Sequence, residues 1–379
     1  MEIYVVRPGD TAESIAKEQN APLSAIADLN QLEYPYRLAE GQALLIPGGS
    51  SDRQKQPIWT GGYAYPFISP WVLRQTLPYL TELLVFSYGF TEEGDLIAPS
   101  LDDTWMLEEA AAAGVRTALT LTPLGEGGYF NNRLVTVLVG SRQARRNLTR
   151  NLLTVLEEKG YQGVNVDFEY VRAEDRDAFT DFVAETARRL HPWGYYVTAA
   201  LAPKYADDQP GLLYEGMDYR GLGQAADRVL LMTYEWGYAY GPPMAVAPLP
   251  QVRRVAEYAL ARIPAEKILL GVPNYGYDWT LPYVQGGPRA RTLGNVEAAQ
   301  MAAACGTSIV FDPTARSPRF QYRKNGAEHQ VWFEDVRSWG AKLELVRELG
   351  FAGIGVWQIN QLFRAGWEWI TDLAEAETI

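Results

Sequence analysis

Two carboxylic acids and an amide lie at alternate positions in one apolar segment, Gly163-Val-Asn-Val-Asp-Phe-Glu169. Successive side chains of a β-strand point to opposite faces, so Asn165, Asp167 and Glu169 are expected to share one face. The Cα atoms of the two acids then lie about 6.5 Å apart. Paired carboxylates raise the apparent pKa of at least one member, which keeps a protonated acid available near neutral pH. The segment therefore predicts general-acid chemistry, such as protonation of a leaving-group oxygen.

The alternative for this segment is an exposed edge strand whose acids face solvent. Helical patterns flank the segment, however, with Leu148, Leu152 and Leu156 before it and Phe179 and Phe182 after it. A strand between two such helices is typical of a buried sheet or barrel in an α/β protein. We therefore expect the polar face to point inward, where it is costly unless it is hydrogen-bonded or functional.

The elements that must position these acids alternate between strand and helix. This order predicts an α/β chain folded as a (β/α)8 TIM barrel, in which functional side chains gather at the carboxyl ends of the strands. A doubly wound sheet is disfavoured because no Gly-x-Gly-x-x-Gly turn follows an early strand. The eight predicted strands lie at residues 61–65, 83–88, 117–122, 163–170, 195–202, 228–234, 267–274 and 353–358.

The interval between the seventh and eighth predicted strands is too long for a single crossover helix. It contains a helical pattern with Val296 and Met301, followed by alternating runs at 308–312, 319–323 and 329–335. We interpret residues 276–336 as a small α+β lobe inserted at the carboxyl face of the barrel. Insertions at that face usually build the walls of a cleft.

The first 48 residues form a separate module with the order strand, helix, helix, strand. Two strands alone are marginal, so they must pack on the two helices. A polar linker at 49–57 follows, and residues 58–379 form the barrel domain. A flexible linker of this length reaches about 15–20 Å, which would let the module swivel beside its neighbour.

This first module resembles the LysM family of glycan-binding modules. The resemblance is carried by Tyr4-x-Val6, Gly9-Asp10-Thr11, Ile15-Ala16, Asn30-x-Leu32 and Leu38-x-x-Gly41-Gln42-x-Leu44-x-Ile46-Pro47. It implies a groove that binds glycans containing N-acetylglucosamine. The residues that it places in the groove are Gly9, Asp10, Thr11, Asn30 and Leu32.

Composition excludes several other classes of protein. The formal net charge of −12 disfavours nucleic acid and anionic membranes as partners. The chain has one cysteine, Cys305, and two histidines, so we expect no disulfide and no metal site, and no cofactor is indicated. No apolar run is long enough to span a membrane, and the N-terminal residues show no signal peptide.

The acidic segment resembles the catalytic strand of family 18 glycoside hydrolases, whose pattern is Asp-x-x-Asp-x-Asp-x-Glu. The corresponding positions are Gln162, Asn165, Asp167 and Glu169, so the last two acids match and the first two are amides. The resemblance implies that Glu169 is the general acid and that Asp167 holds the substrate's acetamido group. Asn165 would support Asp167 through a hydrogen bond. In this family the N-acetyl oxygen of the substrate is the nucleophile, which implies retention through an oxazolinium intermediate.

Two further strand ends carry the same resemblance. Met232-Thr-Tyr234-Glu235 is similar to the family's Met-x-Tyr-Asp, and implies that Tyr234 donates to the acetamido carbonyl and that Glu235 reaches the sugar hydroxyls. Trp357-Gln358 implies a tryptophan floor beneath the sugar that is cleaved, and Tyr63 is a weaker candidate for the cleft. The resemblance also implies non-proline cis peptide bonds after Glu169 and after Trp357.

A LysM module ahead of such a barrel is similar to the spore cortex-lytic and germination glycosidases of endospore-forming bacteria. The resemblance implies an N-acetylglucosaminidase that cleaves cortex peptidoglycan and is deposited in the spore coat or cortex after synthesis in the mother cell. One alternative is a chitinase acting on chitin oligosaccharides, which has the same fold and machinery. Another is an inactive glycan-binding or spore coat protein, which would not need an intact Asp-x-Glu pair.

Overall fold

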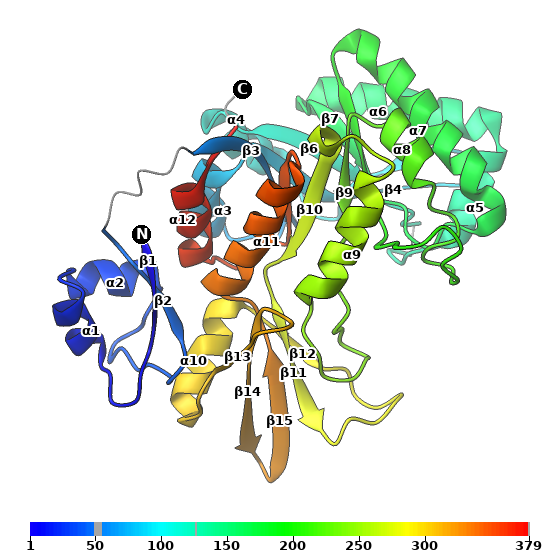
Figure 1. The fold of residues 1–379 in the computed structure, drawn as a ribbon. Helices are drawn as coiled ribbons and strands as arrows, with labels where there is room; N and C mark the ends of the chain where they lie inside the picture. Colours follow the sequence, from blue (N-terminus) through cyan, green and yellow to red (C-terminus); the bar gives the residue numbers. More distant parts are fainter. Residues whose placement is uncertain (49–54, 126, 378–379) are drawn as a thin grey trace.

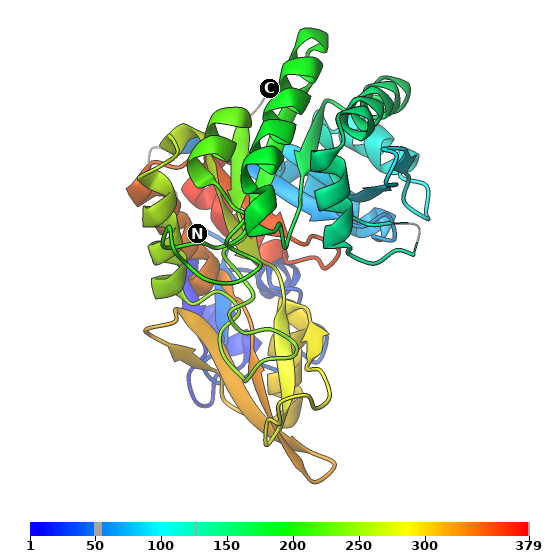
Figure 2. The same ribbon diagram turned by 90° about the vertical axis from the view of Figure 1, so that its right-hand side faces the viewer.

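The computed structural model describes residues 1–48, 55–125 and 127–377. It has three parts: a barrel, a lobe that extends from one end of it, and a small N-terminal module beside the lobe (Figures 1 and 2). The barrel is a closed ring of eight parallel strands, as the sequence predicts. In ring order they are β3 (Gln56–Ala64), β4 (Glu82–Phe90), β6 (Arg116–Leu121), β7 (Gly163–Val166), β8 (Tyr196–Leu201), β9 (Arg228–Leu231), β10 (Ile268–Pro273) and β16 (Gly353–Trp357), and β16 pairs with β3.

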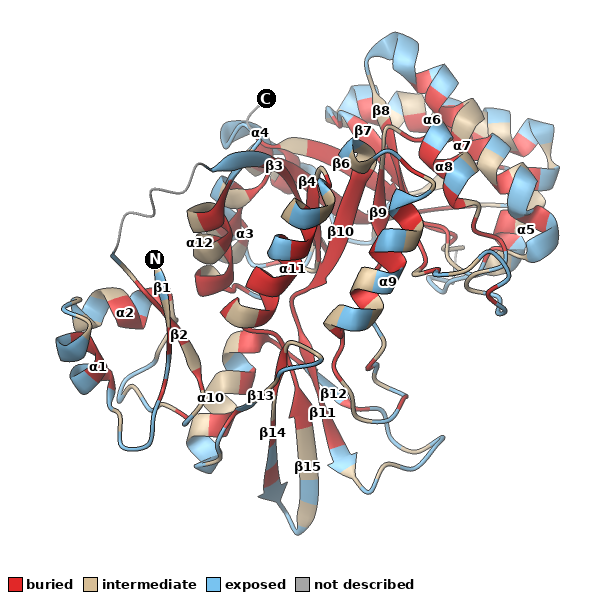
Figure 3. Ribbon diagram, viewed as in Figure 1, coloured by how far each residue is buried: buried red, intermediate tan, exposed pale blue. Residues whose placement is uncertain are grey.

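Helices surround the ring, and the buried residues concentrate in its strands and in the helix faces turned toward them (Figure 3). None of the described helices is long and apolar enough to cross a membrane. Two short strands extend the ring, β5 (Leu96–Ile97) beside β4 and β17 (Ala374–Ala376) beside β3. The helices of the barrel domain are α3 (Pro70–Thr76), α4 (Thr104–Ala112), α5 (Asn132–Gly140), α6 (Arg142–Lys159), α7 (Arg176–Leu190), α8 (Tyr219–Ala225), α9 (Leu249–Leu260), α11 (Val336–Leu349) and α12 (Arg364–Leu373).

The residues around the acidic segment explain its position in the barrel. Helix α6 begins after Ser141, whose side chain accepts a hydrogen bond from the backbone N–H of Ala144, and it ends at Gly160, whose φ of +80° suits glycine. The outward face of the segment is fully apolar, and the ring of Phe168 stacks on Phe179 of α7 at a centroid distance of 5.6 Å. The predicted division into an outward apolar face and an inward polar face is therefore confirmed. Strand β7 itself ends at Val166, so the two acids lie just beyond it.

An α+β lobe is inserted between the seventh and eighth barrel strands, as predicted. It contains a five-stranded antiparallel sheet and α10 (Asn295–Cys305), with a small core of its own. Two of its strands, β11 and β12, were not predicted. In sheet order the strands are β12 (Arg291–Leu293), β11 (Gly276–Leu281), β15 (Ala327–Trp332), β14 (Ser317–Lys324) and β13 (Val310–Asp312).

The N-terminal module has the predicted βααβ order. Its elements are β1 (Glu2–Val5), α1 (Ala12–Glu18), α2 (Leu23–Leu29) and β2 (Ala43–Ile46). The two strands pair antiparallel, and the helices cover one face of the pair over a core that includes Tyr4, Ile15, Ile26 and Leu44. Burial of these side chains supplies the stability that two short strands lack.

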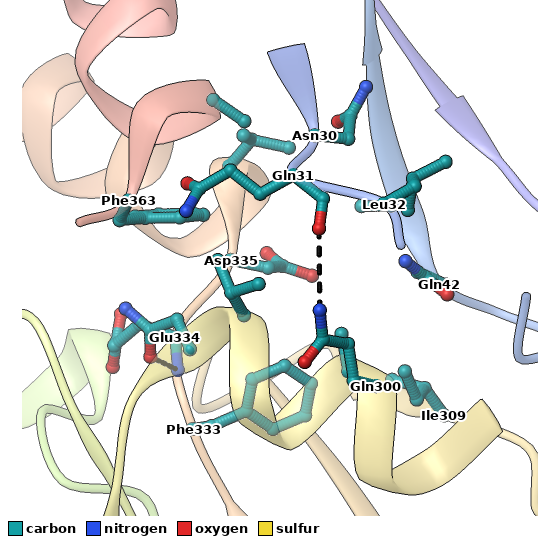
Figure 4. Close-up of a pocket in the computed structure, with 16 residues that line it drawn as sticks. Asn30, Gln31, Leu32, Gln42, Gln300, Ile309, Phe333, Glu334, Asp335 and Phe363 are labelled. Atoms are coloured by element: carbon teal, nitrogen blue, oxygen red, sulfur yellow. Dashed lines mark hydrogen bonds between the residues drawn. The ribbon is translucent and has the colours of Figure 1, made fainter. Parts of the chain in front are cut away.

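The module packs against the lobe, so the expected swivelling is not what the structure shows. The backbone N–H of Ile309 donates to the carbonyl of Glu40 at 2.7 Å, and the Gln300 side chain donates to the carbonyl of Gln31 at 3.3 Å (Figure 4). Gly41 has a φ of +79°, and a Cβ there would collide with the Ile309 carbonyl oxygen. A small pocket of about 40 Å³ remains between the two parts. Residues 49–54 of the predicted linker lie outside the described residues, and residues 56 and 57 belong to β3.

Candidate active site

A cleft of about 680 Å³ opens at the carboxyl ends of the barrel strands. Its walls come from the segments that follow β7, β9 and β16 and from the start of the inserted lobe. Strand ends far apart in the sequence meet there because parallel strands place their carboxyl ends on one face of the barrel. Seven residues singled out in the sequence line this cleft: Asp167, Glu169, Met232, Tyr234, Glu235, Trp357 and Gln358.

Asp167 is 5% exposed, and its Oδ1 has no hydrogen-bond partner among the described residues. Burial raises the pKa of this carboxyl well above its ordinary value, and the charge of Glu169 raises it further. A buried polar atom without a partner is costly, because it has lost its water and gained nothing in return. The atom is therefore placed to accept a hydrogen bond from a ligand in the cleft.

Glu169 is partly exposed and faces the same cleft. Burial raises its pKa to about 6, and the negative charge of Glu235 contributes to the rise. Because Asp167 and Glu169 also repel each other, ionisation of one disfavours ionisation of the other, and they titrate as a pair. The pair can therefore supply a protonated acid beside a charged carboxylate near pH 6.

Asn165 and Tyr63 lie beneath the cleft and do not line it. Asn165 is 1% exposed, and its carbonyl accepts from the Tyr63 hydroxyl at 3.1 Å while its NH₂ donates to the Thr198 hydroxyl at 2.8 Å. These bonds connect Asn165 to the barrel interior, whereas the sequence analysis expected a bond to Asp167. Gln162 lies at the opposite end of the strand, where its carbonyl accepts from the backbone N–H of Thr117 at 2.7 Å. The two amides that replace family acids thus have structural partners.

Tyr234 supplies a hydroxyl from the end of β9. Burial raises its pKa well above the ordinary value, and the charge of Asp167 adds to the rise. The phenol therefore stays protonated at neutral pH and can donate a hydrogen bond into the cleft. Met232, which is 8% exposed, contributes an apolar wall beside it.

An aromatic cluster forms the floor of the cleft around Trp357. The Trp357 ring meets Phe86 at a centroid distance of 4.8 Å and Tyr65 at 5.8 Å, both edge to face. The peptide bond after Trp357 is cis, as expected, whereas the expected cis bond after Glu169 is wrong. A cis bond that was not predicted joins Phe86 and Ser87. An aromatic floor of this kind suits the apolar face of a sugar ring.

Among the cleft-lining residues that sequence reasoning missed are four aromatic residues beside the barrel strands and in the lobe. Tyr65 lines it where Tyr63 was expected, because the side chain at the carboxyl end of the strand, two positions on, is the one that reaches the opening. Phe86 lies in the middle of β4, and Tyr275 and Tyr277 begin the inserted lobe. The pattern Tyr-Gly-Tyr directly after a barrel strand was the available signal for the last two.

The candidate glycan residues of the N-terminal module have different environments. Gly9 and Thr11 are exposed, and Asp10 accepts from the backbone N–H of Arg7 at 2.7 Å. The side chain of Asn30 is tied to β2, because it donates to the carbonyl of Leu45 and accepts from the N–H of the same residue. Leu32 is partly buried at the pocket between module and lobe (Figure 4). The exposed Gly9–Thr11 turn is thus the most accessible of the five positions.

Comparison with known proteins agrees with this fold. Residues 125–361 match the family of glycosyl hydrolases family 18, and residues 4–47 match the LysM domain. The chain therefore belongs to family 18 of the glycoside hydrolases, and it carries a LysM domain ahead of the catalytic barrel. The predicted class of enzyme is confirmed.

Individual relatives and solved structures narrow the comparison beyond the family. The chain is 36% identical to the cortical fragment-lytic enzyme of Bacillus subtilis (strain 168), in an alignment that covers 98% of each chain. The crystal structure of the Bacillus cereus spore cortex-lytic enzyme SleL superposes with a TM-score of 0.83 and 33% identity, covering 99% of this chain and 87% of that one. A chitinase from Chromobacterium violaceum superposes with a TM-score of 0.76 and 25% identity, over 83% of this chain and 98% of that one.

Proposed function

We propose that the protein is a retaining N-acetylglucosaminidase that cleaves the glycan strands of spore cortex peptidoglycan. The similarity to two cortex-lytic enzymes along nearly the whole chain supports this substrate. We place the enzyme in the spore coat or cortex for the same reason. The observation that carries the catalytic part of the proposal is the unpartnered, buried Oδ1 of Asp167 beside Glu169.

In the proposed reaction the sugar to be cleaved rests on Trp357, and its acetamido group points toward Asp167. Asp167 accepts a hydrogen bond from the acetamido N–H, and the Tyr234 hydroxyl donates to the acetamido carbonyl oxygen. Together they fix that oxygen beneath the anomeric carbon. Such positioning replaces a chance encounter by an intramolecular one, which is a large part of the rate gain available to an enzyme.

Cleavage then proceeds in two balanced steps. The acetamido oxygen forms a bond to the anomeric carbon while the bond to the leaving oxygen breaks, and Glu169 transfers its proton to that oxygen. The product of this step is an oxazolinium ion held by Asp167. Water then attacks the anomeric carbon from the face that the leaving group vacated, Glu169 takes one proton from it, and the bond between the anomeric carbon and the acetamido oxygen breaks, which restores the acetamido group on the sugar. Two inversions at one carbon give net retention.

The substrate assignment is tested by analysing the products of the purified full-length protein on decoated spore cortex. Mass spectrometry should find fragments with N-acetylglucosamine at the reducing end, and these should be absent with Glu169→Gln. Chitin oligosaccharides serve as the control substrate. Efficient cleavage of chitin alone would assign a chitinase, and binding without cleavage of either substrate would assign a glycan-binding protein.

We also propose that residues 1–48 anchor the enzyme on peptidoglycan, with the barrel domain and its lobe as the catalytic unit. Gly41→Ala should loosen the packed module, because the added methyl group collides with the Ile309 carbonyl. Gly9→Ala is the matched control, since its φ of +82° imposes the same backbone strain while a Cβ there has open space around it. Limited proteolysis between the module and the barrel should be faster for Gly41→Ala than for Gly9→Ala. Equal rates would mean that this contact does not hold the module.

A further inference from the structure

Two tyrosines of the inserted lobe hold the carboxylate of Glu235. The Tyr275 hydroxyl donates to Glu235 Oε1, and the Tyr277 hydroxyl donates to the same oxygen at 2.9 Å. Glu235 follows β9 with a φ of +68°, a conformation that a non-glycine residue rarely adopts unless its surroundings hold it. The two phenols supply such a restraint, because they fix the end of the side chain that this backbone directs into the cleft.

The start of the lobe sets the positions of the two hydroxyls, and both rings also pack in a cluster with Ala245 and Val246 of the barrel domain. Tyr275 and Tyr277 are 6% and 7% exposed, and their rings meet edge to face at a centroid distance of 5.5 Å. Between them lies Gly276, where a Cβ would collide with the carbonyl oxygen of Trp332 on the neighbouring strand. Tyr277 is paired with Trp332 in the register of β11 and β15. The tight pairing of these two strands thus locates both phenols.

The hydrogen bonds from the two tyrosines also affect the charge of Glu235. Desolvation raises the pKa of Glu235, and the hydrogen bonds from Tyr275 and Tyr277 oppose that rise. The negative charge of Glu235 in turn contributes to the raised pKa of Glu169. The other ionisable groups that bear on this set from the surrounding elements are Tyr65, Asp167, Tyr170, Tyr214, Tyr234, Tyr238 and Arg289.

We propose that Tyr275 and Tyr277 are positioning residues that hold the Glu235 carboxylate beside the acid Glu169, so that the inserted lobe completes the active site of the barrel. The inference rests on the proposed role of Glu169 as general acid. Without the phenol hydroxyls, Glu235 keeps its proton to higher pH and carries less negative charge. Glu169 then loses its own proton at a lower pH, and acid catalysis fails earlier as the pH rises.

The test compares pH profiles of kcat/KM on soluble peptidoglycan fragments for wild type, Tyr275→Phe and Tyr277→Phe. The falling limb on the alkaline side should move to lower pH in both variants. The loss at pH 7 should exceed the loss at pH 5 by about threefold, which corresponds to half a pKa unit. Tyr322→Phe is the matched control, because it removes a phenol that donates to a buried carboxylate, Asp278 at 2.7 Å, in the same lobe.

A second variant separates positioning from folding. In a Glu235→Gln background there is no carboxylate to hold, so Tyr277→Phe should cause no further movement of the limb. Thermal unfolding of each variant reports any loss of folded protein. A limb that stays in place in both tyrosine variants, or a loss that is the same at every pH and matches Tyr322→Phe, would overturn the inference.

The inference also has a readout that does not need turnover. In ¹³C-glutamate-labelled protein, the Glu169 carboxyl resonance, identified by its absence in Glu169→Gln, should titrate at lower pH in Tyr277→Phe than in wild type. An unchanged titration would overturn the inference even if the protein cleaved no glycan. An inactive wild type with a shifted titration would instead overturn the proposed function alone.

Discussion

Two buried carboxylates lie at opposite ends of the barrel and differ in their partners. Glu82 is the first residue of β4 and is 1% exposed, and its two oxygens accept from the Tyr196 hydroxyl at 2.6 Å and from the Trp59 indole N–H at 3.1 Å. Asp167 follows the last residue of β7 and is 5% exposed, with Oδ1 unpartnered. Both are acids inside a barrel that normally takes aliphatic side chains.

The electrostatic surroundings of Glu82 and Asp167 also differ. Burial raises the pKa of both carboxyls, but at Glu82 the two hydrogen bonds and the charges of Arg228 and Arg116 oppose the rise. At Asp167 the neighbouring charge of Glu169 increases it. Burial alone therefore does not separate a structural acid from a functional one. Glu82 has a partner for each oxygen and stabilises the fold, whereas Asp167 combines an unpartnered oxygen with a position in the cleft.

The largest expected effect is on the acid itself. Glu169→Gln keeps the size of the side chain but cannot release a proton to the glycosidic oxygen, so the rate with a sugar leaving group should fall by about 10²–10⁴-fold. The loss should be smaller for an activated aryl glycoside, which needs little protonation. Glu158→Gln, an exposed change on α6, is the control and should have no effect. Equal losses with both leaving groups would show that Glu169 is not the acid.

Asp167→Asn, at the cleft end of the barrel, should reduce the rate without reducing the stability of the protein. The rate should fall by about 10²-fold with either leaving group, because the acetamido nucleophile is positioned less well whatever departs. The melting temperature should stay the same or rise, because a buried carboxylate oxygen without a partner is replaced by a neutral amide. A marked fall in melting temperature would show that Asp167 is a structural acid like Glu82.

Glu82→Ala should give the opposite result at the other end. Removing the carboxylate leaves the Tyr196 hydroxyl and the Trp59 N–H without an acceptor. The free energy of unfolding should therefore fall by about 1–3 kcal/mol for each unpaired donor. Turnover per folded molecule should stay near that of wild type, since no part of Glu82 lines the cleft. Denaturant unfolding and active-site titration measure the two quantities, and a loss of turnover in fully folded protein would break the comparison.

Of the three substitutions in the acidic segment, Asn165→Ala should reduce the rate least, because Asn165 lies beneath the cleft. It breaks the bonds to Tyr63 and Thr198 and should cost about 1 kcal/mol of stability for each. The rate should fall less than in Asp167→Asn, since Asn165 does not line the cleft. Steady-state kinetics beside thermal unfolding would measure both. A rate loss larger than that of Asp167→Asn would assign Asn165 a direct part in the chemistry.

The sequence by itself determined the barrel, the inserted lobe, the LysM domain and the acidic pair. Each of these depends on a local pattern: the alternation along residues 163–169 put Asp167 and Glu169 on one face, and glycine or capping residues marked where helices end. The segment around Trp357 was found in the same way, from the end of an apolar run. Patterns of this kind survive in the sequence because neighbouring residues share one element.

Only the tertiary structure decided which groups satisfy one another across elements. The bond from Tyr63 to Asn165 joins residues 102 positions apart, and the bonds from Tyr275 and Tyr277 to Glu235 join the lobe to β9. The sequence likewise predicted a swivelling module, whereas the hydrogen bond between Ile309 and Glu40 packs the module against the lobe. Hydrogen bonding depends on distance and direction in space, so the sequence predicted an inward-facing Asp167 but not that one of its oxygens lacks a partner.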